Sequence, residues 1–309
     1  MARIVTCTVN PAIDIWTVTE RIEPYRKLRC AEARRDPGGG GINVARVLAR
    51  FGVHATAIYP TGGATGELLR QLVARDGIES VAIPIGGETR EDFTVTEGES
   101  KREYRFVLAG PPLSADACRA LTNALETAAP PPEFAILSGS VPQGVAPGFY
   151  AGLIRAVKAR GARVVVDTSG PALKEALAEG VHLVKPNLRE LSELMGERLE
   201  TEAQRLQAAR TLTRKGSTGI VALSLAEKGA LLVTRDRAWR ARTPSVTPVS
   251  TVGAGDSFLG ALVFAVTSGR APDEALRYGV AAGTAALLWP GTELCHRVDV
   301  ERLLPEVAV

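Results

Sequence analysis

Short apolar runs alternate with helix-like patterns along most of the chain. The runs RIVTCTV, ATAIYPTG, FAILSGS, ARVVVDTSG, VHLVKPN, GIVALSL and GALLVT have the length and composition of buried strands. Between many of them lie segments with helical spacing, such as VARVLARFG, GELLRQLVARDG, GFYAGLIRAVKARG and RLQAARTLTRKG, each ending in a glycine that can cap a helix. This alternation predicts a mostly parallel sheet covered by helices, and therefore an α/β fold.

Two segments interrupt the alternation, at residues 12–35 and about 88–108. They contain IDIWTVTERI, KLRCAEARR, REDFTVTEG and KREYRFVLAG, which alternate as strands and show no helical pattern. We expect them to pair into a small antiparallel sheet, a lid or an oligomer clasp. The main α/β domain is then expected to consist of about 1–11, 36–87 and 109–309.

Composition argues against several classes of protein. Apolar residues make up 45% of the 309 residues, as in ordinary globular chains rather than disordered or fibrous ones. The 37 basic and 34 acidic residues are spread along the chain, which argues against a nucleic-acid partner. Cys7, Cys30, Cys118 and Cys295 lack the spacing of a metal site and are interpreted as reduced thiols. The N-terminal MARIVTCTVNPAIDIW is too polar for a signal or membrane segment, so we expect a cytoplasmic protein.

The strongest candidate for a catalytic segment is STVGAGDSFLG, residues 250–260, which leads directly into a helical pattern. Glycines before a helix leave backbone N–H groups free to converge, and the helix N-terminus adds partial positive charge. Gly253, Ala254 and Gly255 are therefore suited to bind an anion such as phosphate. Asp256 is either an ordinary helix cap or a base that deprotonates an attacking hydroxyl beside that anion.

A second group of polar residues follows two predicted strands. Lys185 and Asn187 come directly after VHLV, Glu190 lies in the first turn of the next helix, and Asp167 ends RVVVD. The carboxyl ends of parallel strands are where open α/β sheets bind ligands. Two carboxylates, an amide and a lysine suit a magnesium–phosphate site, although each residue alone is more often a cap or surface group. The chain has no GxxxxGK[ST] loop and no strict GxGxxG after its first strand.

Residues 37–46, PGGGGINVAR, place four glycines directly before a helical pattern. Because ordering a glycine costs much conformational entropy, four in a row indicate either a loose hinge or a backbone that another group must approach closely.

Five charged residues lie in the strand-like segments: Asp14, Lys27, Arg29, Arg90 and Arg105. Lys27 and Arg29 alternate by two, so we expect them on one face of a strand. A solvated strand face is the ordinary explanation. If the small sheet covers a crevice, however, these cations could hold an anionic substrate.

Taken in this order, PGGGGINVAR, LSGSVPQGV, VVVDTSG, LVKPNLREL, VALSL and STVGAGDSFLGA resemble the phosphofructokinase-B family of ribokinase-like sugar kinases. The resemblance covers essentially the whole chain, and KLRC, GGGGINVAR and YRFV are most similar to the family's minor 6-phosphofructokinase branch of bacteria. It implies a three-layer ribokinase-like fold, a mostly parallel central sheet, and a β lid that pairs two subunits into a homodimer. The implied reaction is phosphorylation of the C1 hydroxyl of fructose 6-phosphate by MgATP, giving fructose 1,6-bisphosphate.

The resemblance also implies a role for each matching residue. Asp256 resembles the catalytic base, with Gly253, Ala254 and Gly255 as its anion hole. The implied sugar ligands are Asp14, Gly39 and Asn43, and Ser138 lies beneath the substrate. The implied holders of the 6-phosphate are Lys27, Arg90 and Arg105, some of which reach across the dimer. The implied ATP residues are Lys185, Asn187, Ser224 and Gly229. The implied magnesium residues, acting through water, are Glu190 and Asp167, and the implied potassium site is formed by Ser250, Val252, Ala286 and Gly291.

This chain departs from the family pattern at several positions. Ala226 stands in the nucleotide loop SLAEKG where glycine is usual, so a positive φ there would cost energy. Trp289 and Glu293 stand where the most similar members have Asn and Arg, but backbone carbonyls supply most ligands of such a site, so potassium binding stays an expectation. Gly40 stands where fructose-1-phosphate and tagatose-6-phosphate kinases usually have lysine, which favours fructose 6-phosphate.

Other functions remain open at this point. The same fold can phosphorylate fructose 1-phosphate, tagatose 6-phosphate or an unphosphorylated sugar. A nicotinamide-dependent oxidoreductase would use the glycines for a dinucleotide, but the missing GxGxxG argues against it. A non-catalytic nucleotide-binding regulator would not need Asp256.

Overall fold

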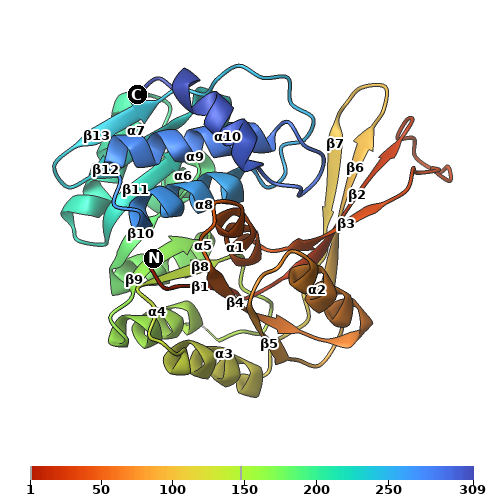
Figure 1. The fold of residues 1–309 in the computed structure, drawn as a ribbon, viewed down its shortest axis with the longest axis horizontal. Helices are drawn as coiled ribbons and strands as arrows, with labels where there is room; N and C mark the ends of the chain where they lie inside the picture. The colour runs from red at the N-terminus through yellow and green to blue at the C-terminus, as the bar shows by residue number, and fades with distance from the viewer. Residues whose placement is uncertain (1, 147) are drawn as a thin grey trace.

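A nine-stranded sheet forms the middle of three layers in the computed structural model, which describes residues 2–146 and 148–309 (Figure 1). Met1, which begins the expected main domain, and Pro147 lie outside the described residues. The strand order is β13-β12-β11-β10-β9-β8-β1-β4-β5, and all neighbours from β11 to β5 are parallel. The strands are β1 (Ile4–Thr8), β4 (Ala55–Thr61), β5 (Ser80–Pro84), β8 (Phe134–Ser138), β9 (Arg163–Asp167), β10 (Val181–Val184), β11 (Thr218–Ser224), β12 (Ala230–Thr234) and β13 (Ala238–Ala241). The expected mostly parallel α/β sheet is confirmed.

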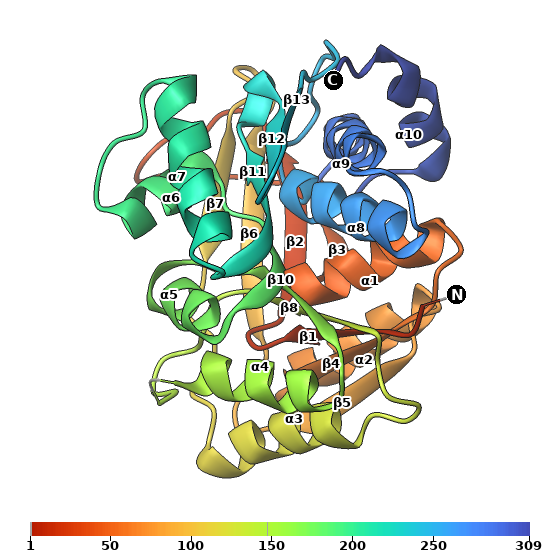
Figure 2. The same ribbon diagram turned by 90° about the vertical axis from the view of Figure 1, so that its left-hand side faces the viewer.

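Helices cover both faces of this sheet, as Figure 2 shows. One face is covered by α1 (Gly40–Arg50), α2 (Gly63–Arg75), α8 (Ala254–Thr267), α9 (Pro272–Ala286) and α10 (Arg297–Leu303). The other is covered by α3 (Ala115–Thr127), α4 (Phe149–Ala159), α5 (Gly170–Glu179), α6 (Leu188–Met195) and α7 (Glu202–Arg214). Short 3₁₀ turns span Ala226–Lys228 and Leu304–Glu306.

The apolar strands alternate between two hydrophobic cores, one on each face of the sheet. In β9, Val164 and Val166 pack into the core beneath α3–α7, whereas Val165 packs into the core beneath α1 and α8. Successive side chains of a strand point to opposite faces, so a strand buried on both faces must be apolar at every position. This requirement explains why the runs were recognisable in the sequence.

The two interrupting segments pair with each other, as expected, into a separate four-stranded sheet in the order β3-β2-β6-β7. Its strands are β2 (Ala12–Thr19), β3 (Arg34–Gly38), β6 (Arg90–Glu97) and β7 (Glu103–Val107). We call this sheet the lid. It projects from the main body in Figure 1.

Three details of the lid differ from the expectation. The central pairing of β2 with β6 is parallel, so the sheet is mixed rather than antiparallel. The segment KLRCAEARR forms a strand only from Arg34 onward, and Cys30 makes an isolated bridge to Thr19. Lys27 and Arg29 therefore do not share a strand face, because they lie in the connection between β2 and β3. Strand β3 also continues beyond residue 35, to Gly38.

Helices α1 and α8 cross closely at Gly260. A Cβ atom at Gly260 would lie 2.7 Å from Val47 Cβ and 3.5 Å from the Val44 carbonyl oxygen. Farther along the same pair of helices, the rings of Phe51 and Phe264 stack with centroids 4.7 Å apart. The close approach places the N-terminus of α8 beside the first turn of α1.

We expect Gly260→Ala to lower the free energy of unfolding by about 1–3 kcal/mol, because the added methyl group must push α8 away from Val47. Chemical unfolding followed by circular dichroism measures this change. The matched control is Gly152→Ala in α4, where an added Cβ meets nothing within 4 Å. There the substitution should raise stability by about 0.5–1 kcal/mol, since alanine favours a helix. Equal effects at the two positions would contradict the packing argument.

Candidate active site

Polar residues line the carboxyl edge of the central sheet. Thr8, Ser138 and Asp167 are the last residues of β1, β8 and β9, and they pair directly in register. Lys185 follows β10 immediately. Because the strands are parallel, all of these groups reach the same edge, which is the expected location of a ligand site in an open α/β sheet.

The segment GAGD forms the start of α8. Gly253 has a left-handed φ of 74°, and a Cβ there would lie 2.6 Å from Leu294 Cδ2. The Ser257 amide donates to the Gly253 carbonyl at 2.9 Å and begins the helical ladder. The amides that precede it in the first turn have no intrahelical acceptor, so they are free to bind an anion at the positive end of the helix.

Asp256 lies in this first turn and contacts α1. The Asn43 side-chain amide donates to Asp256 Oδ2 at 2.8 Å. A Cβ on Gly40 would lie 3.3 Å from Asp256 Oδ1 and 2.1 Å from Ser138 Oγ. The second carboxylate oxygen of Asp256 therefore faces the backbone of the glycine run and the end of β8.

The four glycines are positions of close approach rather than a hinge. A Cβ on Gly38 would lie 2.4 Å from Asp14 Oδ1, one on Gly39 2.5 Å from Thr8 Cγ2, and one on Gly41 2.6 Å from Thr8 Oγ1. Gly40 begins α1, and Gly39, at φ 111°, is the residue before it. The run thus brings backbone against the sheet edge and Asp256 in a way that larger residues would obstruct.

Lys185 and Asp167 form a buried ion pair at the sheet edge, with Nζ and Oδ1 3.1 Å apart. Lys185 Nζ also lies 3.6 Å from the position of a Cβ on Gly255, so the ammonium group adjoins the N-terminus of α8. Burial lowers the pKa of Lys185, but Asp167, Glu190 and Asp256 outweigh this effect and raise it overall. Burial raises the pKa of Asp167 to about 6, which Lys185 opposes and Asp256 reinforces.

Asn187 and Glu190 form a capping box at the start of α6. Asn187 Oδ1 accepts from the Glu190 amide, and Glu190 Oε2 accepts from the Asn187 amide, both at 2.9 Å. The ordinary interpretation of these residues as a helix cap is therefore correct for these two oxygens. The charge of Glu190 still reaches the site, since it raises the pKa of both Asp167 and Lys185.

The expected nucleotide loop follows β11. The Ser224 amide donates to the Pro186 carbonyl at 3.0 Å, which joins this loop to the segment after β10. Ala226 has a φ of 51°, which is the left-handed conformation that the usual glycine would adopt more easily. A left-handed conformation costs a non-glycine residue about 1–2 kcal/mol. Gly229 closes the loop, and a Cβ there would lie 2.1 Å from the Ala241 carbonyl oxygen.

One face of the lid is charged and turned toward the main body. Strand register places Asp14 opposite Asp92 and Arg105 opposite Thr94, so Asp14, Arg90, Asp92 and Arg105 share one face. On that same face, Glu103 Oε2 accepts from the Thr251 amide at 3.1 Å, next to the GAGD segment. The structure thus brings Asp14, Arg90 and Arg105 to the face of the lid that covers the sheet edge.

The surroundings of two predicted phosphate holders, Arg90 and Lys27, differ within one chain. Arg90 donates to both carboxylate oxygens of Asp92, at 2.7 and 2.8 Å, and to the Asn10 carbonyl. Lys27 is exposed in the connection between β2 and β3, and no hydrogen bond or ion pair of its side chain is found among the described residues.

The predicted potassium residues belong to two loops that meet. The Val249 amide donates to the Leu287 carbonyl at 2.7 Å, which places Ser250 and Val252 beside the end of α9 at Ala286. Gly291 is buried with a φ of 55°. The side chains of Trp289 and Glu293, which differ from the family pattern, contact other residues. Trp289 Nε1 donates to Asp299 at 3.0 Å, and Glu293 forms ion pairs with Arg34 and His296.

Three residues of the site were not predicted from the sequence. Asp92 lies two positions after Arg90 on the same strand, and this spacing was a usable signal for the pair. Arg46 lies three positions after Asn43 on α1, and its guanidinium contacts the Asn43 side chain at 3.1 Å. Thr8 accepts from the Ile42 amide at 2.9 Å, a contact that no local pattern indicates.

Within residues 2–146 and 148–309, no group of three His, Cys, Asp or Glu side chains converges as a metal site, and no helix is long and apolar enough to cross a membrane.

Comparison with known proteins identifies the family. Residues 5–298 match the family described as pfkB family carbohydrate kinase. The chain belongs to this family. It is 42% identical to the ATP-dependent 6-phosphofructokinase isozyme 2 of Mycobacterium tuberculosis, over 97% of this chain and 88% of that protein. The Escherichia coli protein of the same name is 40% identical over 98% of both chains.

Solved structures confirm the fold of this kinase. Phosphofructokinase-2 from Escherichia coli in complex with fructose-6-phosphate has a TM-score of 0.92 at 38% identity, covering 99% of both chains. The same protein in complex with potassium has a TM-score of 0.94 at 40% identity, again over 99% of both chains. Arabidopsis thaliana ribokinase shares the fold, with a TM-score of 0.74 at 21% identity over 98% of both chains.

The buried carboxyl group of Asp14 has a raised pKa. Burial, followed by the charges of Asp92 and Asp256, raises the pKa of Asp14 from an ordinary 3.8 to about 7. The folded state thus holds the proton more tightly than the unfolded chain. The stability from this protonation is complete below pH 3.8 and is lost as the pH rises to about 7.

We therefore expect Asp14→Asn to be more stable than the parent at pH 8 by on the order of 1 kcal/mol or more, with a much smaller difference at pH 5. Urea unfolding at the two pH values measures the difference. The exposed Asp236→Asn variant serves as the control and should show no such change between pH values. If the two proteins differ in stability by the same amount at pH 5 and pH 8, the pKa of Asp14 is not raised in the folded protein.

Proposed function

We propose that this kinase transfers the γ-phosphoryl group of MgATP to the C1 hydroxyl of fructose 6-phosphate. The observation that carries the proposal is the placement of Asp256: Asn43 holds one of its oxygens, and the other faces the glycine run beside the free amides of α8. The similarity to two bacterial 6-phosphofructokinases, and to one structure in complex with fructose-6-phosphate, supports this acceptor.

In the proposed reaction, Asp256 accepts the proton of the C1 hydroxyl as the sugar oxygen forms its bond to the γ-phosphorus. The bond from that phosphorus to the bridging oxygen of ATP breaks, and its electron pair leaves with ADP. The amides of Gly253, Ala254 and Gly255 and the Lys185 ammonium stabilise the negative charge on the transferring group.

Lys185, Asn187, Ser224 and Gly229 are the proposed contacts of ATP. Asp167 and Glu190 would hold magnesium through water. When bound, magnesium neutralises phosphate charge and orients the transferring group. The buried Lys185–Asp167 pair and the second oxygen of Glu190 fit this arrangement, because they supply charge at the sheet edge without closing a metal cage.

A potassium ion is proposed between the loops that contain Ser250 and Val252 on one side and Ala286 and Gly291 on the other. One feature of the structure fits a nearby cation. Glu103 Oε1 is buried and has no hydrogen-bond partner among the described residues, whereas Oε2 of the same carboxylate contacts Thr251 in this loop. A buried carboxylate oxygen without a donor favours positive charge beside it.

The lid is the proposed source of acceptor specificity. Its charged face carries Arg90, which is neutralised by Asp92, and Arg105, which is exposed. Arg105 is therefore the better candidate for the main 6-phosphate contact within one chain. Gly40 places no side chain beside Asp256 Oδ1, which favours a substrate whose phosphate lies far from the reacting hydroxyl. The alternative acceptors are fructose 1-phosphate, tagatose 6-phosphate and unphosphorylated sugars.

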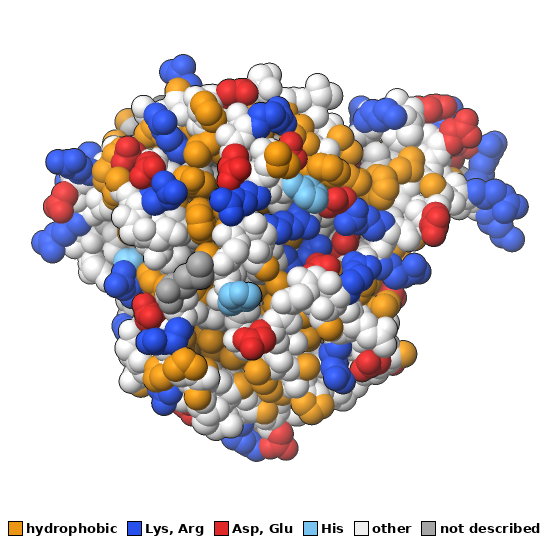
Figure 3. Space-filling model, viewed as in Figure 1, with side chains coloured by type: hydrophobic (Ala, Val, Ile, Leu, Met, Phe, Trp, Pro, Cys, Tyr) orange, Lys and Arg blue, Asp and Glu red, His pale blue; other side chains and the backbone are white. Residues whose placement is uncertain are grey.

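The lid is also the proposed dimer interface. It exposes large apolar side chains, which a soluble surface rarely carries in groups: Tyr25, Leu28, Phe106, Val107 and Leu108. Cations lie at the same projecting arm, visible at its tip in Figure 3. In a homodimer paired through the lids, Lys27 would reach the acceptor site of the partner subunit. A cytoplasmic location, where ATP and sugar phosphates are available, is part of the same proposal.

For the base, we expect Asp256→Asn to lower kcat by roughly 10² or more while ATP still binds, because asparagine keeps the shape but cannot take the proton. Steady-state ADP release and calorimetric ATP binding measure the two quantities. Asp273→Asn, in the first turn of the neighbouring helix α9, is the matched control and should keep the parent kcat. Near-parental turnover of Asp256→Asn would rule out its role as the base.

For the acceptor, we expect kcat/KM to be higher for fructose 6-phosphate than for fructose 1-phosphate or fructose. Arg105→Ala should lower kcat/KM for fructose 6-phosphate about tenfold or more, since a charge-assisted contact contributes about 1.5–3 kcal/mol. The same variant should lose little activity on fructose. Arg102→Ala, an exposed lid cation outside β7, is the control. A preference for fructose 1-phosphate, or an equal loss on fructose, would overturn the assignment.

A further inference from the structure

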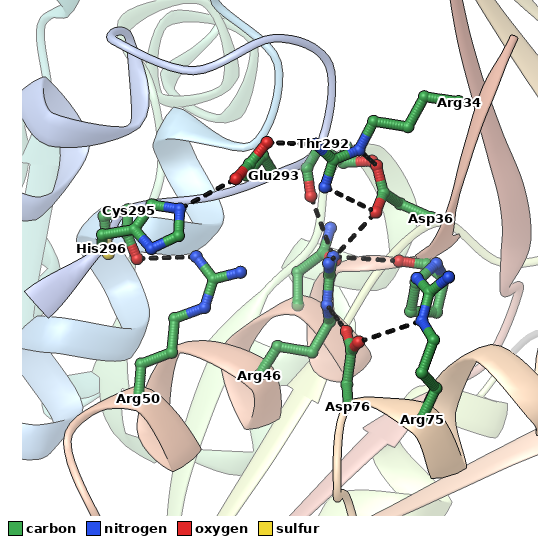
Figure 4. Close-up of polar contacts among 12 residues, drawn as sticks. Arg34, Asp36, Arg46, Arg50, Arg75, Asp76, Thr292, Glu293, Cys295 and His296 are labelled. Atoms are coloured by element: carbon green, nitrogen blue, oxygen red, sulfur yellow. Dashed lines mark hydrogen bonds and ion pairs between the residues drawn. The ribbon is translucent and has the colours of Figure 1, made fainter.

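Arg46 is a buried arginine on α1 whose guanidinium group contacts acceptors from several segments of the chain (Figure 4). Its side chain is only 2% exposed. Nε donates to Asp76 at 2.7 Å, and Nη2 lies 3.5 Å from Asp36. Nη1 donates to the Thr292 carbonyl at 3.0 Å and to Asn43 Oδ1 at 3.1 Å. One side chain thus joins the lid strand β3, the turn after α2, the loop after α9 and the first turn of α1.

The contact with Arg46 decides how the Asn43 amide is turned. A guanidinium group can only donate hydrogen bonds, so the Asn43 atom that faces it must be the oxygen. The NH₂ group of Asn43 must then point the other way, where it donates to Asp256 Oδ2 at 2.8 Å. If the amide were reversed, its oxygen would face the Asp256 carboxylate and repel it. Arg46 therefore selects the one orientation of Asn43 that can hold Asp256.

The charge of Arg46 is balanced so that it can remain buried. Asp76 pairs with it at 2.7 Å, and Asp36, which is 1% exposed, lies at the other side of the guanidinium and is shared with Arg34. A planar fork with five donors can contact both carboxylates and the Asn43 oxygen at once. A lysine at this position carries the same charge, but its single ammonium group cannot reach these acceptors from one point. The geometry requires the fork and not only the charge.

We propose that Arg46 is a positioning residue for phosphoryl transfer: it fixes the Asn43 amide, and Asn43 in turn holds Asp256 with its Oδ1 directed at the acceptor hydroxyl. This inference rests on the proposed function, because it concerns the orientation of the proposed base. Since Asp36 belongs to the lid strand β3, the same guanidinium also ties the lid to the base.

The first test is Arg46→Lys, which keeps the charge and removes the fork. We expect kcat to fall about tenfold or more, as small misplacements of reacting groups commonly cause. The KM for ATP should change by less than about twofold, since the described contacts of Arg46 include none of the proposed nucleotide residues. Arg50→Lys is the matched control: Arg50 is one turn further along α1 and donates to the Cys295 carbonyl at 2.8 Å, without contact to Asn43. Its kcat should remain at the parent value.

A double-mutant cycle separates positioning through Asn43 from a general structural effect. If Arg46 acts through Asn43, Arg46→Lys should cost little further kcat once Asn43→Ala has removed the amide. If Arg46 only stabilises the fold, Arg46→Lys should lower kcat by the same factor in both backgrounds. The second result would overturn the proposal.

A measurement on the unmodified protein keeps the proposal testable if Arg46→Lys fails to fold. The side-chain amide of Asn43, assigned by the loss of its NMR signal in Asn43→Ala, should be protected from solvent exchange and should rotate slowly. A freely rotating amide would contradict the proposal. The outcomes are also distinct from those of the proposed function: if Asp256→Asn loses activity but Arg46→Lys keeps the parent kcat, Asp256 is the base and Arg46 does not position it.

Discussion

The hydrogen bond from Asn43 to Asp256 is the contact on which the rest of the site depends, because it joins the N-termini of two helices that are far apart in the sequence. It can form only where α1 and α8 come close, and glycine allows this at both ends of the contact. Gly40 lets the backbone pass beside Asp256, and Gly260 lets α8 lie against Val47. Ordering the glycine-rich segment costs conformational entropy, and in return the backbone can lie close enough for Asp256 to be held in place.

Charge around this contact is arranged in two zones. At the sheet edge, Lys185 is held between carboxylates and adjoins the positive end of α8, so this zone favours phosphate. On the lid, Asp14 lies beside Asp92 and near Asp256, has no direct ion-pair partner within residues 2–146 and 148–309, and its pKa rises to about 7. A group that destabilises the folded protein at neutral pH suits a role in ligand binding, where a sugar hydroxyl can satisfy it. Burial beside two carboxylates is thus the common basis of the expected stability difference and of the sugar contact that the family resemblance implies for Asp14.

The sequence predicted those parts of the structure that depend on local pattern. Strands buried on both faces were recognisable because every residue had to be apolar, and the helix start at GAGD was recognisable from its glycines. The parallel pairing of β2 with β6 was not predictable, because register between distant segments is set by packing and not by either segment alone. For the same reason Lys27 was placed on a strand that the chain does not form. The ion pair of Arg46 with Asp76 was not predictable either, because Asp76 follows α2 and no spacing in PGGGGINVAR indicates this contact.

The most direct test of this account is a crystal structure of the protein with fructose 6-phosphate and a non-hydrolysable ATP analogue. The account predicts that the C1 hydroxyl oxygen lies about 2.6–3.2 Å from Asp256 Oδ1, while Asn43 still donates to Oδ2 and the terminal phosphate lies over the first amides of α8. A sugar bound with C1 turned away from Asp256, or an Asn43 amide that has left Asp256 in this complex, would contradict it.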